Sequence, residues 1–85
     1  MITQINTIND VKEFATHLVQ IEKLSFHPED DFNDYVNIKT REAFYTKEEA
    51  QKRNYLMNKC FHICEKLNVE IYEILLPIIQ KPFLV

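Results

Sequence analysis

Residues 46–68, TKEEAQKRNYLMNKCFHICEKLN, decide the fold of this chain. Thr46 followed three residues later by Glu49 is the pattern of a capping box, in which each side chain bonds the other residue's backbone N–H. Apolar residues then recur at helical spacing and fall within an arc of roughly 160° on a helix that turns 100° per residue. The stretch therefore predicts an amphipathic helix over 47–67 whose apolar side must be covered by other elements. That side consists of Ala50, Leu56, Met57, Cys60, Phe61, Ile63, Cys64 and Leu67.

The rest of the chain shows the same helical periodicity in three further segments, which predicts helices over 9–24, 28–36 and 70–80. Thr7 or Asn9 can cap the first of them, and Pro28 suits the first position of the short one. We therefore expect an all-α fold, a small bundle of three principal helices plus one short helix.

Three local details complete this expectation. Asn68 should end the long helix in a left-handed conformation, and Pro77, which has no N–H, should kink or end the last one. Residues 36–45 fit a minor β-hairpin and an irregular loop about equally well.

Size and composition limit both fold and function. With 85 residues, the chain has room for a single small domain over 1–85, and 46% hydrophobic content is too apolar for a disordered segment. The sequence contains no glycine. The P-loop, the Rossmann fingerprint, the EF-hand loop and the nucleophile elbow each require glycine where a side chain would collide, so these classes are excluded.

Charge is unevenly distributed along the chain. Residues 1–38 contain two lysines and seven acidic residues, a balance of −5, and residues 39–85 have a balance of +2, which gives the net charge of −3. The N-terminus lacks the pattern of a secretory signal, and no apolar run approaches the ~20 residues of a membrane span. We therefore predict a cytoplasmic protein, and two cysteines without a disulfide pattern fit that compartment.

Cys60 and Cys64 lie one helical turn apart and face the same side. A metal site there would need two more ligands, for which His17 and His27 are the candidates. The spacing is not that of a structural zinc knuckle, and buried free cysteine is a common small apolar residue. We therefore predict that both thiols pack in the core, with no metal and no cofactor.

Four acidic residues, Glu29, Asp30, Asp31 and Asp34, are explained mainly by the preference of a helix start for negative charge. Weak cation binding or docking of a basic partner is the alternative. Arg53 lies inside the apolar arc of the long helix. Either its aliphatic part packs while the guanidinium reaches the rim, or it forms an ion pair with Asp31 or Asp34. The second interpretation is slightly favoured.

The basic segment 39–59 provides an alternative function, that of a small DNA-associated helical regulator. Three acidic residues interrupt it, the chain is acidic overall, and no helix shows a recognition surface along one exposed side. Nucleic-acid binding is therefore the less favoured function. The three histidines, His17, His27 and His62, form no catalytic pattern with a nucleophile or a carboxylate, and no small-molecule substrate is evident, so we predict that the protein is not an enzyme.

The C-terminal segment points to interaction with another protein. Its helix is apolar on nearly all sides, and more apolar surface is present than two short helices obviously cover. The sequence therefore predicts a non-catalytic protein–protein interaction module, with a homodimer as one form of it; closure of the core by the same segment is the structural alternative. The predicted interface residues are Ile71, Leu75, Leu76, Ile79, Phe83 and Leu84.

The runs LSFHPEDDFNDYVN (24–37) and YTKEEA (45–50) resemble a family of small bacterial proteins with no assigned function. In that family a glycine often follows the threonine equivalent to Thr40, whereas this chain has Arg41. The resemblance implies a compact, mainly helical domain and brings no activity, cofactor or catalytic residue with it.

Overall fold

A computed structural model describes residues 1–37 and 44–80 of the chain. The elements are α1 (Ile8–Thr16), which continues as the π-helical turn η1 (His17–Ile21), the 3-10 turn η2 (Phe32–Tyr35), α2 (Lys47–Lys66) and α3 (Ile71–Gln80). Within the described ranges no strand is present, which confirms the predicted all-α class. None of the helices in these ranges is long and apolar enough to cross a membrane.

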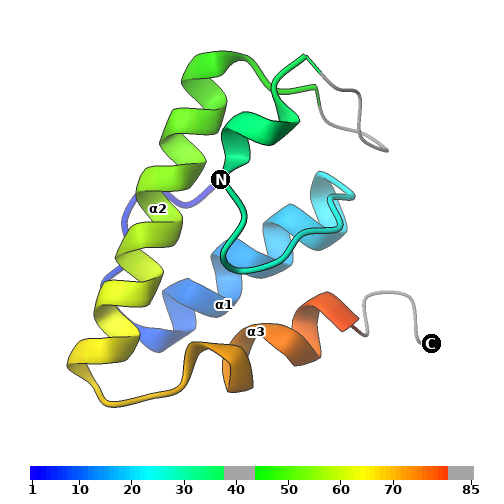
Figure 1. The fold of residues 1–85 in the computed structure, drawn as a ribbon. Coiled ribbons are helices and arrows are strands. Elements are labelled where there is room, and N and C mark those ends of the chain that lie inside the picture. The colour runs from blue at the N-terminus through cyan, green and yellow to red at the C-terminus, as the bar shows by residue number, and fades with distance from the viewer. Residues whose placement is uncertain (38–43, 81–85) are drawn as a thin grey trace.

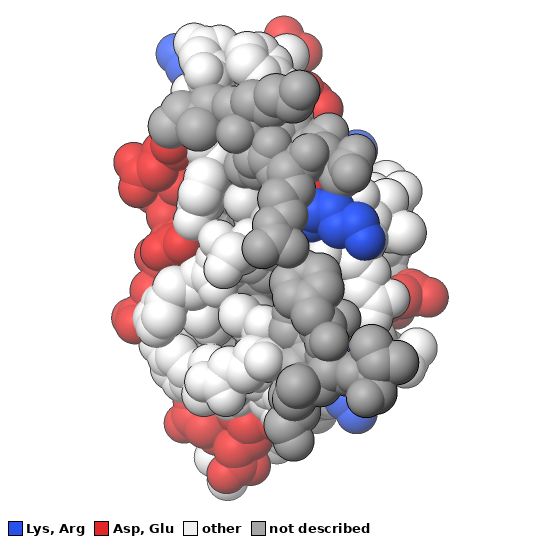
Figure 2. All heavy atoms as spheres, turned by 90° about the vertical axis from the view of Figure 1, so that its right-hand side faces the viewer, with Lys and Arg blue, Asp and Glu red and all other residues white. Residues whose placement is uncertain are grey.

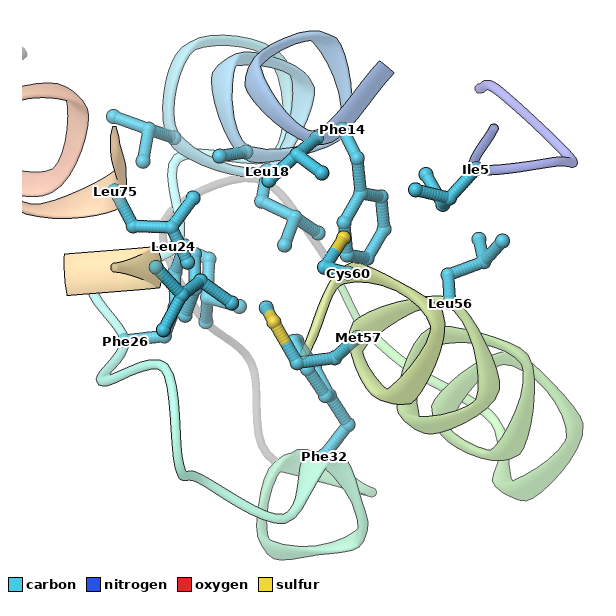
Figure 3. Packing of buried hydrophobic residues seen from close by; sticks show 14 of the residues in the cluster. Ile5, Phe14, Leu18, Leu24, Phe26, Phe32, Leu56, Met57, Cys60 and Leu75 are labelled. Atoms are coloured by element: carbon cyan, nitrogen blue, oxygen red, sulfur yellow. The ribbon is translucent and has the colours of Figure 1, made fainter. Parts of the chain in front are cut away.

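Figure 1 shows α2 along one side of the molecule, with α1 and α3 extending away from it next to each other. α1 contacts α3 along its length, and η2 packs against α2. α1, η2 and α3 all contact α2, and its buried apolar residues belong to the predicted apolar side. Leu67, which was predicted on the same side, is 50% exposed. Figure 3 shows Met57 and Cys60 of α2 pointing toward Phe14 and Leu18 on the opposite side of the core.

The helix starts are fixed by local hydrogen bonds. The Glu49 N–H donates to Thr46 Oγ1 at 3.2 Å and the Thr46 N–H donates to Glu49 Oε1 at 3.0 Å, so the predicted capping box is confirmed. A second box joins Thr7 and Asp10 at the start of α1. Thr7, and not Asn9, is therefore the cap of the first helix.

Left-handed backbone positions, which glycine would normally occupy, are taken by Lys23, Asn37 and Asn68 among the described residues. Asn68 ends α2 as predicted, in a Schellman motif in which the Val69 N–H donates to the Cys64 carbonyl at 2.8 Å. Lys23 was not expected there. It follows η1, where the Leu24 N–H reaches the Leu18 carbonyl at 3.0 Å.

Three predicted boundaries are corrected. The first helix was predicted over 9–24 and ends at Ile21, because Lys23 takes a left-handed conformation. The short helix predicted over 28–36 is reduced to η2, because the Asp31 carboxylate caps it by accepting from the Asn33 N–H at 2.9 Å. The alternative in which Pro77 ends the last helix is also wrong. α3 continues to Gln80, because Ile71 and Leu75 anchor its first two turns in the core.

The predicted link at 36–45 falls largely on residues 38–43, outside the described ranges. On either side of them, Val36 and Tyr45 form an isolated parallel bridge, and the Asn37 N–H donates to the Tyr45 carbonyl at 3.3 Å.

Lys23→Gly should stabilise the protein by about 0.5 kcal/mol. A left-handed conformation costs a non-glycine residue roughly 1–2 kcal/mol, which exceeds the entropy that glycine adds to the unfolded chain, about 0.5–1 kcal/mol. Urea unfolding followed by circular dichroism measures the change. Gln20→Gly, within the π-helical turn η1, is the control and should lower stability by about 1 kcal/mol. If both variants are destabilised, the left-handed assignment of Lys23 is wrong.

Candidate functional site

The most constrained polar group is the guanidinium of Arg53, which is only 6% exposed. Its Nε donates to Glu22 Oε1 at 3.0 Å, one Nη donates to Glu22 Oε2, and the other donates to the Glu49 carbonyl at 3.0 Å. An ion pair was predicted, but with Asp31 or Asp34. The structure pairs Arg53 with Glu22 instead, because the end of η1 lies over the first half of α2.

Glu22 has two further partners. The Tyr45 hydroxyl donates to Glu22 Oε1, and His17 Nε2 lies 3.1 Å from Glu22 Oε2. The Arg53 guanidinium carbon lies 4.4 Å from the centre of the Tyr45 ring, a cation–π arrangement. We call His17, Glu22, Tyr45 and Arg53 the Glu22 cluster.

The electrostatics of this cluster favour the ion pair. Burial would by itself raise the pKa of Glu22, but the hydrogen bonds from Arg53 and Tyr45 outweigh it and lower that pKa below its ordinary value. Burial raises the pKa of Tyr45, and the bond to Glu22 raises it further. Glu22 and Arg53 therefore carry charge and Tyr45 keeps its proton. The polar atoms of the cluster bind one another, which is the arrangement of a structural network.

The four acidic residues of the 29–34 segment serve mainly internal contacts. Asp31 accepts from Asn54 Nδ2 at 2.8 Å, while Asn54 Oδ1 accepts from the Phe32 N–H at 2.9 Å, so this segment is fastened to α2. Asp30 accepts from the Tyr35 hydroxyl, and Asp34 lies in the first turn of η2.

The thiols of Cys60 and Cys64 lie in the core, at 0% and 2% exposure, as predicted. Burial raises the pKa of Cys60 to about 12, so this thiol is protonated at neutral pH and is a poor nucleophile or metal ligand. Of the candidate ligands, His17 belongs to the Glu22 cluster, and His27 is exposed and accepts from the Glu29 N–H. Across residues 1–37 and 44–80, no three His, Cys, Asp or Glu residues are arranged to hold a metal.

The predicted interface is divided by the structure. Ile71 and Leu75, at 5% and 0% exposure, face the core and are not available to a partner. They stand one turn apart on the side of α3 that packs against α1. Leu76 and Ile79 are half-buried, and Phe83 and Leu84 lie outside the described residues.

A different part of α3 borders an open surface depression of about 450 Å³ between α1 and α3. Val69, Ile74, Pro77 and Ile78 supply its apolar lining, and all four retain exposed surface. Lys12 on α1 and Glu73 on α3 supply its charges. We call this depression the α1–α3 groove. None of the predicted interface residues that the structure describes, Ile71, Leu75, Leu76 and Ile79, lines this groove.

The exposed side of α2 carries Lys52, Tyr55, Lys59, His62 and Lys66 at alternating spacings of three and four residues, which places them in one line on a helix. Lys59 Nζ lies 5.3 Å from the centre of the Tyr55 ring. Three of these five residues are lysines, so the exposed side of α2 is basic. Arg53, which was counted in the predicted basic segment, belongs to the core side.

No protein-family model, curated protein or solved structure matches this chain. The resemblance to a family of small bacterial proteins therefore stays a prediction, and the function must be argued from the molecule itself.

Arg53→Met should cost about 3 kcal/mol of stability at pH 7, because it leaves the Glu22 carboxylate buried without a cation. The lowered pKa of Glu22 means that the ion pair stabilises the native protein fully above the ordinary pKa of 4.5, and less as the pH falls through the lowered value. The difference in stability between wild type and variant should therefore shrink as the solution is acidified below that pH. Urea unfolding at a series of pH values measures it.

The double variant Glu22→Gln/Arg53→Met is the control for this experiment. It buries no charge, and the amide oxygen that replaces the carboxylate at position 22 would still accept a hydrogen bond from Tyr45, so most of the lost stability should return. Equal stability of Arg53→Met and wild type at pH 7 would show that the ion pair contributes nothing.

Proposed function

We propose that this protein is a cytosolic, non-catalytic protein–protein interaction module that self-associates through the α1–α3 groove. The observation that carries the proposal is the combination of half-exposed apolar residues with one cation and one anion at the rim of the same groove. Contiguous exposed apolar surface rimmed by polar residues is a feature of protein–protein interaction sites.

The charges of the groove favour a second copy of the chain as the partner. In a two-fold symmetric dimer the same surface lies on both sides of the interface, so that surface must be complementary to itself. With Lys12 on one helix and Glu73 on the other, a two-fold axis through the groove places Lys12 of each copy next to Glu73 of its partner. Ile74 and Ile78 then form the apolar centre.

Two observations support a non-catalytic role. The titratable groups of the Glu22 cluster bind one another, and the protonated thiol of Cys60 lies in the apolar core. Neither offers a reactive group to a substrate. Free thiols also agree with a reducing compartment.

Lys12→Glu and Glu73→Lys should each weaken the dimer, because each places like charges opposite one another, and the double variant should restore it with the charges exchanged. Sedimentation equilibrium over a range of concentrations measures the dissociation constant. We expect at least a fivefold weakening in each single variant. Both residues are exposed, so the variants should fold normally.

A second pair of variants tests the apolar centre. Ile78→Glu should abolish dimerisation, while Ile79→Glu, a half-buried isoleucine outside the residues that line the groove, should leave it unchanged. A wild-type protein that stays monomeric at millimolar concentration would refute self-association. Dimerisation that depends on Ile79 and not on Ile78 would assign it to another surface.

The line of lysines on α2 supports one second candidate function, association with DNA. Three lysines seven residues apart are separated by about 10.5 Å along the helix, and a helix can approach the phosphate backbone or enter the major groove. The net charge of −3 opposes this binding.

Binding to DNA should give a mobility shift at low ionic strength that weakens steeply with added salt. Lys59→Glu should reduce the shift and lower the salt slope by roughly 1 or more, whereas Lys23→Glu, which is not part of the line of lysines on α2, should have little effect. If no binding occurs even at low ionic strength, this function is excluded.

A further inference from the structure

A second concave surface lies where the 28–31 segment, α2 and the start of α3 meet. It consists of two adjoining depressions of about 440 and 300 Å³, which share Glu29 and Phe61 among their lining residues. Phe61, which is half-buried, provides apolar surface where the two depressions meet. We call the two depressions together the acidic groove.

The charge of this groove has one sign. Its lining includes Glu29, Asp30, Asp31, Glu65 and Glu70, and none of its lining residues is a lysine, arginine or histidine. On the face drawn in Figure 2, acidic residues likewise gather along one edge. Carboxylates around a low-dielectric surface concentrate the electric field in the cleft and favour a cationic ligand.

Three of the carboxylates are held in place by hydrogen bonds. Glu29 accepts from the Tyr72 hydroxyl at 2.6 Å, which links the 28–31 segment to α3. Asp31 accepts from the Asn33 N–H and from Asn54, and these bonds lower its pKa. Asp30 accepts from the His27 N–H at 2.9 Å. The groove is therefore charged and preorganised before any ligand arrives.

The dimensions suit a peptide better than a single ion. Along α2 the lining runs from Asn54 to Glu65, which corresponds to about 16 Å at 1.5 Å per residue. That length accommodates roughly three turns of a helix. The apolar surface of Phe61 lies where the two depressions meet, between the acidic residues of each, so a matching ligand needs an apolar side chain flanked by cations.

We propose that the acidic groove binds a basic amphipathic helical segment of a partner protein, with lysine or arginine opposite the carboxylates and an aliphatic or aromatic side chain against Phe61. The acidic groove and the α1–α3 groove have Val69 in common, but Glu65 and Glu70 do not line the α1–α3 groove, so variants at these two positions test the acidic groove separately from self-association. It supplies a hetero-partner surface in addition to the proposed dimer surface.

A fluorescent twelve-residue helical peptide, with lysines on one side and leucines on the other, provides the probe, and fluorescence anisotropy measures its binding to the full chain. We expect saturable binding that weakens at high salt. Glu65→Lys/Glu70→Lys should weaken it at least tenfold. The matched control Glu13→Lys/Glu48→Lys makes the same change of net charge at exposed positions outside the groove and should change affinity less than twofold.

Two further measurements separate the groove from general attraction of charges. Replacing the leucines of the peptide by serine should weaken binding at least tenfold without altering the protein. The dimer constant of Glu65→Lys/Glu70→Lys should equal that of wild type, so failure of either proposal is recognised separately. Equal weakening in the groove variant and its control, equal binding of the serine peptide, or no binding at low salt would each overturn the proposal.

Discussion

The buried charge of Arg53 is the constraint on which the arrangement of the helices depends. A guanidinium at 6% exposure must be paired, because an isolated charge in such a position costs several kcal/mol. Its partners come from three places: Glu22 at the end of η1, the Glu49 carbonyl in the first turn of α2, and the ring of Tyr45. Of these partners, Glu22 lies outside α2, and its ion pair with Arg53 joins two segments that are 31 residues apart in the chain.

The π-helical turn η1 helps to place Glu22 in this cluster. In a regular α-helix, His17 and Glu22 would lie about 140° apart, since five residues turn through roughly 500°. The wider turn of a π-helix brings residues five apart onto one side, and His17 and Glu22 are in contact there. Lys23 in the left-handed region then turns the chain away toward Phe26. Local backbone irregularity is thus explained by the position that Glu22 must occupy.

How far the sequence predicts this molecule depends on the range of each interaction. The capping boxes and Asn68 were identifiable because their partners lie within a few residues of them. The partner of Arg53 was not identifiable, because several carboxylates in the chain could pair with a guanidinium. Only the tertiary packing selects Glu22, which is 31 residues away. One signal was present: Glu22 was the single charge that interrupted the apolar stripe of the first helix. Arg53 interrupts the apolar side of the long helix in the same way, with the opposite charge. Pairing these two residues with each other would have named Glu22 as the partner of Arg53 in place of Asp31 and Asp34.

The exposed apolar surface of α3 follows from the small size of the chain. A chain of 85 residues buries only about 60–65% of its unfolded surface, so its last helix cannot be covered on every side. Ile71 and Leu75 fill the core, and the remaining apolar residues of α3 stay half-exposed around it. The sequence shows that α3 has more apolar residues than one buried side requires. It does not show which of them face the core, because apolar residues lie on nearly all sides of the helix. The position of α1 decides which side of α3 is buried. Ile74 and Ile78 remain beside Lys12 and Glu73 at the open side of the bundle.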